Sequence, residues 1–394
     1  MRLLNQIIAV TWLNLRNLPQ RLGSSTVAII GVAAVVLVFA AVLSMANGFE
    51  RTMLGAGSED TAIILRSGAT SELSSGLGNS QVLIVETAPG VLKDGDKPLM
   101  SAELYVVVDV KKKSNNAEAN VPFRGIQPGA FDVRQDVTLA EGRMFEPGKN
   151  EIVVGRSAQQ EFLGLDTGAT IRFGQTEWSV VGVFDAAGSV TESELWTDVR
   201  VLQGAYRRGN SFQSVRVKLE SPDAITELEA ALEDDPRISA DVTSEKEYYA
   251  GQAAGLTQFI KLVGYPLTVL MAIGAVFGAL NSMYSSVSVR GKEIATLRAL
   301  GFGPFPILVS TIVESTLLAL IGGILGGAIA FLVFNGFQVS TLGASFSQVV
   351  FDFAVTPDLL IQGIYAALII GAFGGLFPAI RAARLPVAQA LREL

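Results

Sequence analysis

The sequence Ile307–Leu332, ILVSTIVESTLLALIGGILGGAIAFL, decides the fold. It contains one charged residue, Glu314, and as a helix it would extend about 39 Å, more than the roughly 30 Å hydrocarbon core of a bilayer. Three further apolar runs contain no Asp, Glu, Lys or Arg: Ser24–Met45, Leu262–Met283 and Leu359–Phe377. A buried helix of a soluble protein could account for one such run but not for four. We therefore predict four transmembrane helices.

The short segments beside these runs differ in basic residues. Residues 1–23, 284–306 and 378–394 each carry three Lys or Arg, whereas residues 333–358 carry none. Because basic residues are enriched on the cytoplasmic side of membrane proteins, we expect both termini and the 284–306 loop in the cytoplasm. The long segment 48–258 and the 333–358 loop then lie outside.

Two residue types are absent from the whole sequence. It has no cysteine and no histidine, so it cannot form a disulfide, a thiolate metal site or a Ser-His-Asp triad. The Gly-Lys pairs at 148–149 and 291–292 are followed by Asn and Glu, so neither forms a P-loop. These absences argue against an enzyme, and we expect no cofactor in this chain.

The segment 48–258 is long enough for one or two small cores. Short runs of β-branched and aromatic residues predict strands, including Ala62–Leu65, Tyr105–Val110 and Ser214–Leu219, and amphipathic runs predict helices, including Ala224–Glu233. The segment carries 32 acidic and 20 basic residues. This excess argues against nucleic acid and anionic lipid as its partners, although it is also the ordinary composition of a soluble surface.

A charged stretch, Arg290-Gly-Lys-Glu-Ile-Ala-Thr-Leu-Arg-Ala-Leu-Gly301, separates the second and third apolar runs. Arg290, Ile294, Leu297 and Arg298 share one face of a helix, and Gly301 stands where a left-handed cap would end it. This pattern predicts a short amphipathic helix at the cytoplasmic membrane surface that presents a face to a partner.

The third apolar run contains two further candidate features. Glu314 is either a functional intramembrane carboxylate or one that is paired or reaches the headgroups. The four glycines form two overlapping Gly-x-x-x-Gly patterns, which indicate close helix packing or dimerisation: Gly322, Gly323, Gly326 and Gly327.

The stretch Arg290–Gly301, followed by Glu314-Ser315, closely resembles the FtsX-like permease domain of the MacB-type ABC transporters. The ending Pro378-Ala-Ile-Arg-Ala-Ala-Arg-Leu-Pro-Val-Ala-Gln-Ala-Leu-Arg is similar to that of the family. Glu141-Gly-Arg-Met-Phe, Glu151-Ile-Val-Val-Gly-Arg and Trp178-Ser-Val-Val-Gly-Val-Phe resemble its periplasmic core domain.

The resemblance implies an integral membrane α-helical protein whose large α+β extracytoplasmic domain is inserted between the first and second of four transmembrane helices. It also implies a division of the chain into these parts: 1–23, a cytoplasmic interfacial helix; 24–54, the first transmembrane helix and stalk; 55–243, the periplasmic core domain; 244–285, stalk and second transmembrane helix; 286–304, a cytoplasmic coupling helix; 305–333, the third transmembrane helix; 334–357, a short periplasmic loop; 358–379, the fourth transmembrane helix; 380–394, a cytoplasmic tail.

The resemblance further implies a bacterial inner-membrane permease subunit driven by a separate cytoplasmic ABC ATPase dimer, which would bind the ATP and Mg. The residues it assigns to ATPase coupling are Arg290, Lys292, Glu293, Ile294, Leu297, Arg298 and Gly301. The implied partners are a second permease copy or a related permease, membrane lipid, and a periplasmic adaptor with an outer-membrane exit duct. Export or extraction of a lipid, lipoprotein, peptide or drug is the leading function. The alternative is a transducer that regulates a periplasmic partner such as a cell-wall hydrolase.

Overall fold

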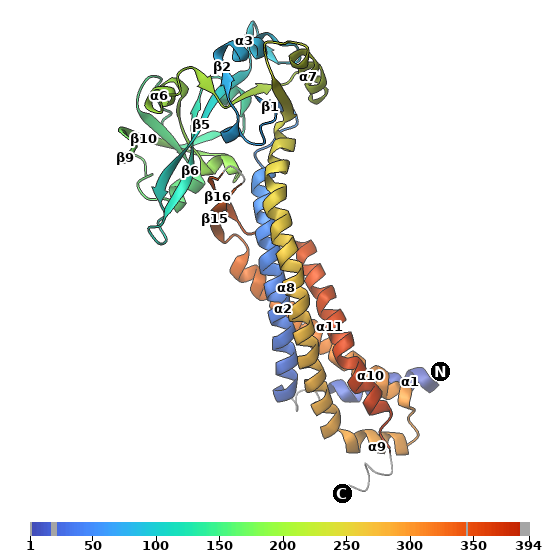
Figure 1. Cartoon of the computed structure of the whole chain (residues 1–394). Helices are drawn as coiled ribbons and strands as arrows, with labels where there is room; N and C mark the ends of the chain where they lie inside the picture. Colours follow the sequence, from blue (N-terminus) through green and yellow to red (C-terminus); the bar gives the residue numbers. More distant parts are fainter. Residues whose placement is uncertain (1, 17–21, 344–345, 387–394) are drawn as a thin grey trace. The chain divides into compact units, whose positions relative to one another are not determined.

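The computed structural model describes residues 2–16, 22–343 and 346–386, and these form two compact units (Figure 1). The helix unit contains residues 1–47, 259–337 and 353–394, and the inserted domain contains residues 48–258 and 338–352. The chain passes between the two units four times.

The helix unit is built from the predicted apolar runs. Within the described residues, four helices are long and apolar enough to cross a membrane: α2 (Leu22–Leu54), α8 (Glu245–Val289), α10 (Pro304–Phe334) and α11 (Pro357–Ala383). Buried side chains from all four form one apolar cluster that includes Val32, Ala275, Ala319 and Ala367. The helices α2 and α8 each continue into the inserted domain. The end of α2, residues 48–54, and the beginning of α8, residues 245–258, belong to that domain.

The glycines of α10 permit close approach of its neighbours. A Cβ atom on Gly322 would lie 2.7 Å from the carbonyl oxygen of Ile29 in α2, and one on Gly326 would clash with the backbone of Ala33. Gly323 and Gly327 face α11, where their nearest atoms belong to Ala367 and Leu360. Both Gly-x-x-x-Gly patterns therefore pack against helices of the same chain.

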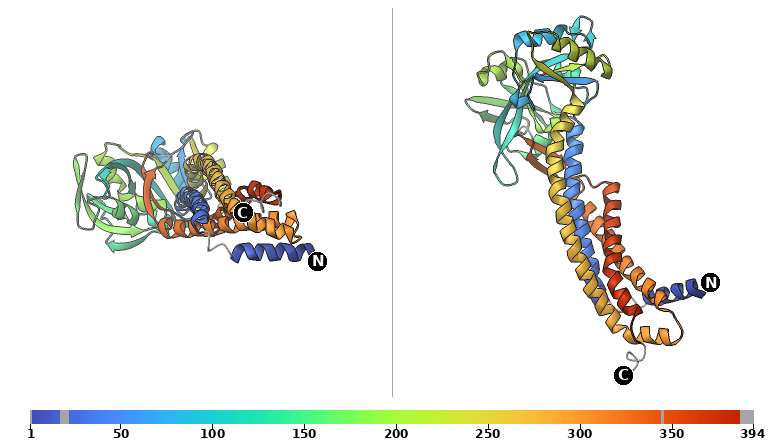
Figure 2. Two further views of the ribbon diagram at one scale, coloured as in Figure 1. Left: turned by 90° about the horizontal axis from the view of Figure 1, so that it is seen from below. Right: turned by 45° about the vertical axis from the view of Figure 1, so that its right-hand side comes forward.

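Two shorter helices complete the unit, α1 (Arg2–Arg16) and α9 (Gly291–Ala299). The helix α1 lies beside α10 (Figure 2) and buries Val10 and Asn14. Its apolar side chains Leu4, Ile8 and Trp12 are exposed along one stripe. This amphipathic pattern is the one expected of a helix at a membrane interface.

A ten-stranded mixed sheet forms the centre of the inserted domain, in the order β14-β1-β13-β5-β6-β11-β8-β10-β7 with β9 paired to β10. The strands are β1 (Thr61–Arg66), β5 (Met100–Lys111), β6 (Glu118–Ile126), β7 (Thr138–Gly142), β8 (Glu151–Gly155), β9 (Thr170–Phe173), β10 (Thr176–Asp185), β11 (Leu195–Asp198), β13 (Ser214–Lys218) and β14 (Ala240–Ser244). Pairs β6/β11 and β8/β10 are parallel, and the remaining pairs are antiparallel.

Short elements surround the sheet. The helices are α3 (Asn79–Thr87), α4 (Ala130–Val133), α5 (Arg156–Glu161), α6 (Val199–Ala205) and α7 (Ile225–Glu233), and the 3-10 turns are η2 (Glu72–Ser74), η3 (Val190–Ser193) and η4 (Pro222–Ala224). Small pairs are made by β2 (Leu77–Gly78) with β12 (Ser211–Phe212) and by β3 (Lys93–Asp94) with β4 (Lys97–Pro98).

The two faces of the central strands are both buried but differ in chemistry. In β5, Leu104 and Val106 join the main apolar core, whereas Glu103 and Tyr105 point to the opposite face, since side chains alternate along a strand. The same alternation places Val215 in the core and Arg216 on the opposite face of β13. One face of the sheet therefore carries the apolar core, and the other carries buried charges.

The connection between α10 and α11 contains a hairpin of β15 (Gln338–Leu342) and β16 (Gln348–Asp352) that belongs to the inserted domain. Val350 joins the main core, and its backbone N–H donates to Ser193 Oγ at 2.9 Å. Phe351 packs edge-on against Phe49 with ring centroids 5.4 Å apart. The segment predicted as a short loop thus supplies part of a folded domain.

Candidate functional site

The helix α9 is set by a sharp corner after α8. Arg290 breaks the helical pattern with φ −92° and ψ 4°, yet its carbonyl oxygen accepts the N–H of Ile294 and so begins α9. At the other end Gly301 has φ +95°, and the N–H of Phe302 bonds the carbonyl oxygen of Leu297. The predicted left-handed glycine cap is confirmed, since L-residues avoid this conformation.

One face of α9 is attached to the rest of the helix unit. Ile294 is buried against Val287, Ile307 and Ala382. Arg298 Nη1 donates to the carbonyl oxygens of Ala383 at 3.1 Å and Leu385 at 2.9 Å, close to the end of α11. These contacts fix α9 between α8, α10 and α11.

Arg290 forms a buried polar junction among three segments. Its guanidinium donates to Glu314 Oε2 in α10 at 2.6 Å and to Asn14 Oδ1 in α1. Asn14 Nδ2 in turn donates to Ser310 Oγ at 2.8 Å. The side chains of Arg290 and Glu314 are only 5% and 4% exposed, so the charges of this pair have little access to water.

The opposite face of α9 is open. Lys292, Glu293 and Thr296 are exposed on it, and Leu300 at its end is 73% exposed. Two further large apolar side chains beside the helix are also exposed, Val289 and Phe305. These side chains are no part of the packing that attaches α9, so this face is accessible from outside the helix unit.

The structure therefore divides the residues predicted for coupling into two groups. Arg290, Ile294 and Arg298 face inward and contact their own chain, and Leu297 is half-buried with them. Lys292 and Glu293 face outward. The amphipathic face that the sequence singled out is the attached face, because its spacing reflects packing within the chain. Glu314 is paired with Arg290.

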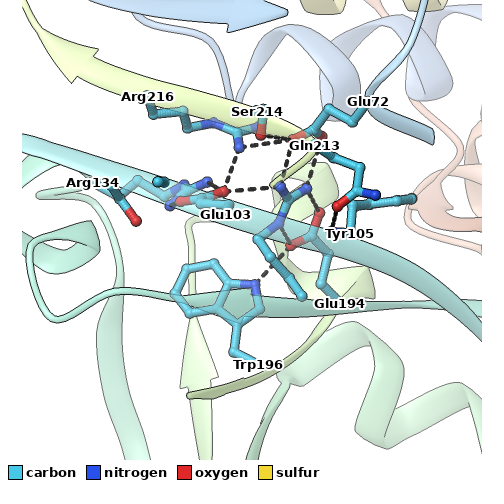
Figure 3. A network of polar contacts seen from close by, with 12 residues as sticks. Glu72, Glu103, Tyr105, Arg134, Glu194, Trp196, Gln213, Ser214 and Arg216 are labelled. Atoms are coloured by element: carbon cyan, nitrogen blue, oxygen red, sulfur yellow. Dashed lines mark hydrogen bonds and ion pairs between the residues drawn. The ribbon is translucent and has the colours of Figure 1, made fainter. Parts of the chain in front are cut away.

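A second polar site lies in the inserted domain, on the charged face of the sheet (Figure 3). Arg124 is its centre: the guanidinium donates to Glu72 at 2.6 and 2.9 Å, to Glu194 at 2.6 and 2.7 Å and to Glu103 at 2.9 Å. Trp196 Nε1 donates to Glu194 Oε2 at 2.7 Å, and the Arg124 guanidinium stacks over the Tyr105 ring. Each guanidinium nitrogen of Arg124 thus donates to at least one glutamate carboxylate.

Two more arginines extend the site to the beginning of α8. Arg216 donates to Glu103 at 2.6 Å and, through Nε, to Glu245 Oε1 at 2.8 Å. Its Nη2 donates to the hydroxyl of Tyr249, also in α8. Arg134 makes a bidentate contact with Glu103 at 2.6 and 2.8 Å. We name the residues Glu72, Glu103, Arg124, Arg134, Glu194, Arg216 and Glu245 the buried charge cluster.

The arginines control the ionisation of the carboxyls in this cluster. Burial would raise the pKa of Glu103, but the nearby guanidiniums of Arg134 and Arg216 outweigh burial and lower this pKa to about 2. Burial likewise opposes the ionisation of Glu72, and Arg124 and Arg216 hold its pKa well below the ordinary range. Burial raises the pKa of the Tyr105 hydroxyl above its ordinary value of 10.0, and the nearby carboxylates of Glu194 and Glu72 act in the same direction.

Beside the cluster lies a cavity of about 40 Å³, room for one or two water molecules. Its lining includes Met53 from α2, Tyr248 from α8, and Ser347, whose hydroxyl is 2.8 Å from that of Tyr105. Segments of α2, α8 and the β15–β16 hairpin therefore meet the sheet at this point. Among the residues that the structure describes, no group of three or more His, Cys, Asp or Glu could hold a metal ion.

The buried charge cluster was not predicted from the sequence. Its members come from sequence positions as far apart as Glu72 and Glu245, and a single sequence does not show which strands pair. One signal was present: Glu103, Arg124 and Arg216 are charged residues in the middle of apolar strand runs. Such residues are seldom buried unless they are paired.

Comparison with known families agrees with both units. Residues 25–235 match the family described as the MacB-like periplasmic core domain, and residues 267–387 match the FtsX-like permease C-terminal family. The chain belongs to the MacB and FtsX-like family of ABC permeases. Four membrane-type helices with an inserted α/β domain between the first and second are the architecture of this permease.

The permease is similar to curated relatives over most of its length. It is 26% identical over 399 residues to the macrolide export ATP-binding/permease protein MacB of Vibrio parahaemolyticus, which covers 92% of this chain and 56% of that protein. It is 24% identical over 301 residues to the uncharacterized ABC transporter permease YknZ of Bacillus subtilis, covering 72% of each chain. The chain thus spans little more than half the length of the MacB protein.

Two solved structures also match the inserted domain of the permease. The periplasmic region of MacB from Actinobacillus actinomycetemcomitans is 17% identical, with a TM-score of 0.37, and covers 49% of this chain and 92% of that chain. The extracellular domain of YknZ from Gram-positive bacteria is also 17% identical, with a TM-score of 0.36, and covers 47% of this chain and 100% of that chain.

Proposed function

We propose that this permease is the membrane subunit of an ABC transporter whose ATPase is a separate chain that docks on the exposed face of α9. The observation that carries the proposal is the division of α9 into two faces. Ile294, Arg290 and Arg298 hold one face on the helix unit, whereas Lys292 and Leu300 stand free of that packing on the other. A helix that is firmly held on one side can pass on a force applied to the other.

The path of such a force follows the backbone. A single residue, Arg290, separates α9 from the end of α8 at Val289. The continuous helix α8 has 45 residues, about 68 Å of helix, and its first turn enters the buried charge cluster through Glu245. In this proposal, ATP-driven movement of α9 would be passed through α8 to the inserted domain.

The remaining assignments follow from the family and the charge distribution. We place α9 and both termini in the cytoplasm of a bacterial inner membrane, because basic residues gather in those segments, and the inserted domain on the other side. The partners would be an ABC ATPase dimer that binds ATP and Mg, and a second copy or a related permease. A macrolide-like drug, lipid, lipoprotein or peptide would be exported or extracted, with an adaptor and exit duct where the cell has an outer membrane.

The docking face is tested by the double variant Lys292→Glu/Leu300→Asp in the full-length permease. Both side chains are exposed, so we expect the thermal stability to stay that of the wild type. Co-purification of the ATPase and its stimulation by the permease should fall at least tenfold, because the variant places two new negative charges on the interface. Arg298 is unsuitable for this test, because its loss would also free the end of α11 from α9.

A matched control is Leu83→Asp, which introduces the same charge at an exposed leucine of α3 in the inserted domain. It should leave ATPase binding unchanged. Wild-type binding and stimulation by the Lys292→Glu/Leu300→Asp variant would place ATPase docking elsewhere. Transport of a labelled substrate by the reconstituted complex then tests export itself.

A further inference from the structure

The buried charge cluster contains unequal numbers of cations and anions. Its three guanidiniums belong to Arg124, Arg134 and Arg216, and its four carboxyls belong to Glu72, Glu103, Glu194 and Glu245. No side chain of the seven is more than 7% exposed. If all were ionised, the cluster would hold one uncompensated negative charge away from water, which is strongly unfavourable. A single proton on one carboxyl makes the cluster neutral.

The hydrogen bonds indicate which carboxyl carries that proton. Glu72 accepts four hydrogen bonds, all from arginine or serine donors, and Glu103 accepts four from arginines. Glu194 accepts three. Among the described residues, Glu245 accepts one, from Arg216 Nε. Since donors stabilise the ionised form, Glu245 is the carboxyl whose ionised form receives the least support.

A cavity beside Glu245 also allows protons to reach and leave its carboxyl group. Glu245 lines a cavity of about 260 Å³ that is distinct from the smaller one beside Tyr105. The charged groups that share its lining are Arg134, Asp136 and Lys218. Lys218 is paired with Asp60 at 2.8 Å, and Arg134 with Glu103, so neither cation is directed to Glu245 alone.

The other titratable groups close to Glu245 do not replace the proton. From the sheet, Glu103 adds a like charge, and Arg216 divides its donors among Glu72, Glu103, Glu245 and the Tyr249 hydroxyl. On α8 itself, Lys246 pairs with Glu59 at 2.6 Å and Glu247 is exposed. Every cation near Glu245 is thus shared with another anion.

We propose that Glu245 is a proton-binding site that controls how firmly α8 is attached to the sheet of the inserted domain. With the proton bound, the cluster is neutral and the first turn of α8 is held by Arg216. Loss of the proton leaves an extra buried negative charge, which weakens this attachment or draws water into the cavity. Proton binding at Glu245 requires neither the substrate nor ATPase docking on α9.

The direction of the pH effect follows from which state binds the proton. The attached state of α8 binds it more tightly than the detached state, so the attachment is strongest at acidic pH. It weakens as pH rises through the value at which Glu245 ionises in the attached state. For one proton the equilibrium changes by up to about tenfold per pH unit between the pH at which Glu245 ionises in the detached state and the higher pH at which it ionises in the attached state, and it levels off above the latter.

The test uses the full-length permease in lipid nanodiscs and the variant Glu245→Gln, whose neutral amide imitates the protonated acid. Hydrogen exchange of the amides of residues 246–252 is followed from mildly acidic to alkaline pH, after correction for intrinsic exchange. We expect protection in the wild type to fall by up to about tenfold per pH unit as the pH rises from the ordinary glutamate pKa, about 4.3, to the pH at which Glu245 ionises in the attached state, and to level off above it. It should stay constant in Glu245→Gln. The matched control Glu247→Gln, on the exposed side of the same turn, should behave as the wild type.

A second measurement identifies the proton directly. Infrared difference spectra of wild type against Glu245→Gln at neutral pH should contain the C=O band of a protonated carboxylic acid, and the Glu247→Gln spectra should not. Absence of that band would overturn the proposal, as would pH-dependent protection that persists in Glu245→Gln. A Glu245→Gln protein that fails to fold would also overturn it, because a neutral side chain at this position is what the proposal requires.

Discussion

Replacing Arg290 by methionine is the sharpest test of the junction between α1, α9 and α10. Methionine keeps the length and apolar stem of the side chain and removes the guanidinium. Glu314 is then left buried without its 2.6 Å partner, and Asn14 loses the donor to its side-chain oxygen. The converse variant, Glu314→Met, leaves the Arg290 guanidinium without its carboxylate.

The expected magnitude follows from the burial of the pair. Breaking a buried ion pair by removing one partner costs about 3–5 kcal/mol, because the remaining charge is uncompensated. Both side chains of this pair are at most 5% exposed, so solvent gives little relief. Each single variant should therefore destabilise the helix unit by about that amount. The double variant Arg290→Met/Glu314→Met leaves no buried charge, so it should recover most of the loss.

The assay is reversible unfolding of the full-length permease in mixed micelles, with the four proteins compared as a double-mutant cycle. Lys149→Met is a matched control, because its ammonium lies at the same 2.6 Å from Glu146 but both side chains are more than half exposed. It should leave the transition unchanged. If the effects of Arg290→Met and Glu314→Met simply add in the double variant, the two charges do not depend on each other and the junction has another basis.

Two further changes can be measured with the same protein. Gly326→Val should destabilise the helix unit or prevent its assembly, because a Cβ atom at this position meets the backbone of Ala33. Gly278→Ala should be tolerated, because a Cβ atom there has open space. Equal folding yields of the two variants would contradict the close packing of α10 on α2. Acid unfolding of the inserted domain, followed by tryptophan fluorescence, should begin only below the ordinary glutamate pKa of 4.5. The stability that comes from the lowered pKa values of Glu72 and Glu103 is present above pH 4.5 and is lost as the pH falls toward about 2. A transition above pH 4.5 would show that the fold does not hold these carboxylates ionised.

The membrane helices were predictable from the sequence because hydropathy is a local property. The run Leu262–Met283 predicted a transmembrane helix, and α8 contains it within Glu245–Val289. Strand positions were also local signals: a strand was predicted over Ser214–Leu219, and β13 extends over Ser214–Lys218. The strand β6 was not predicted, because Pro122 and Gly125 interrupt its apolar pattern. The hairpin after α10 was missed because its strands pack on residues far away in sequence.

The candidate sites depend on contacts between residues that are distant in sequence, which helical spacing alone does not predict. Helical spacing correctly placed Arg290, Ile294 and Arg298 on one face of α9, but spacing cannot tell an attached face from an exposed one. That distinction depends on Glu314 and the end of α11, which only the folded chain brings together. The buried charge cluster depends in the same way on the pairing of β13 with β5 and of β5 with β6.

The β15–β16 hairpin has a practical consequence for work on the inserted domain. A polypeptide cut at residues 48 and 258 would contain the whole ten-stranded sheet but would lack Val350 from its core and the N–H that Ser193 Oγ accepts. The Tyr105 hydroxyl would also lose Ser347. For crystallography or ligand screening, the isolated domain should therefore also contain residues 338–352, fused through a flexible linker, so that its core stays closed to water.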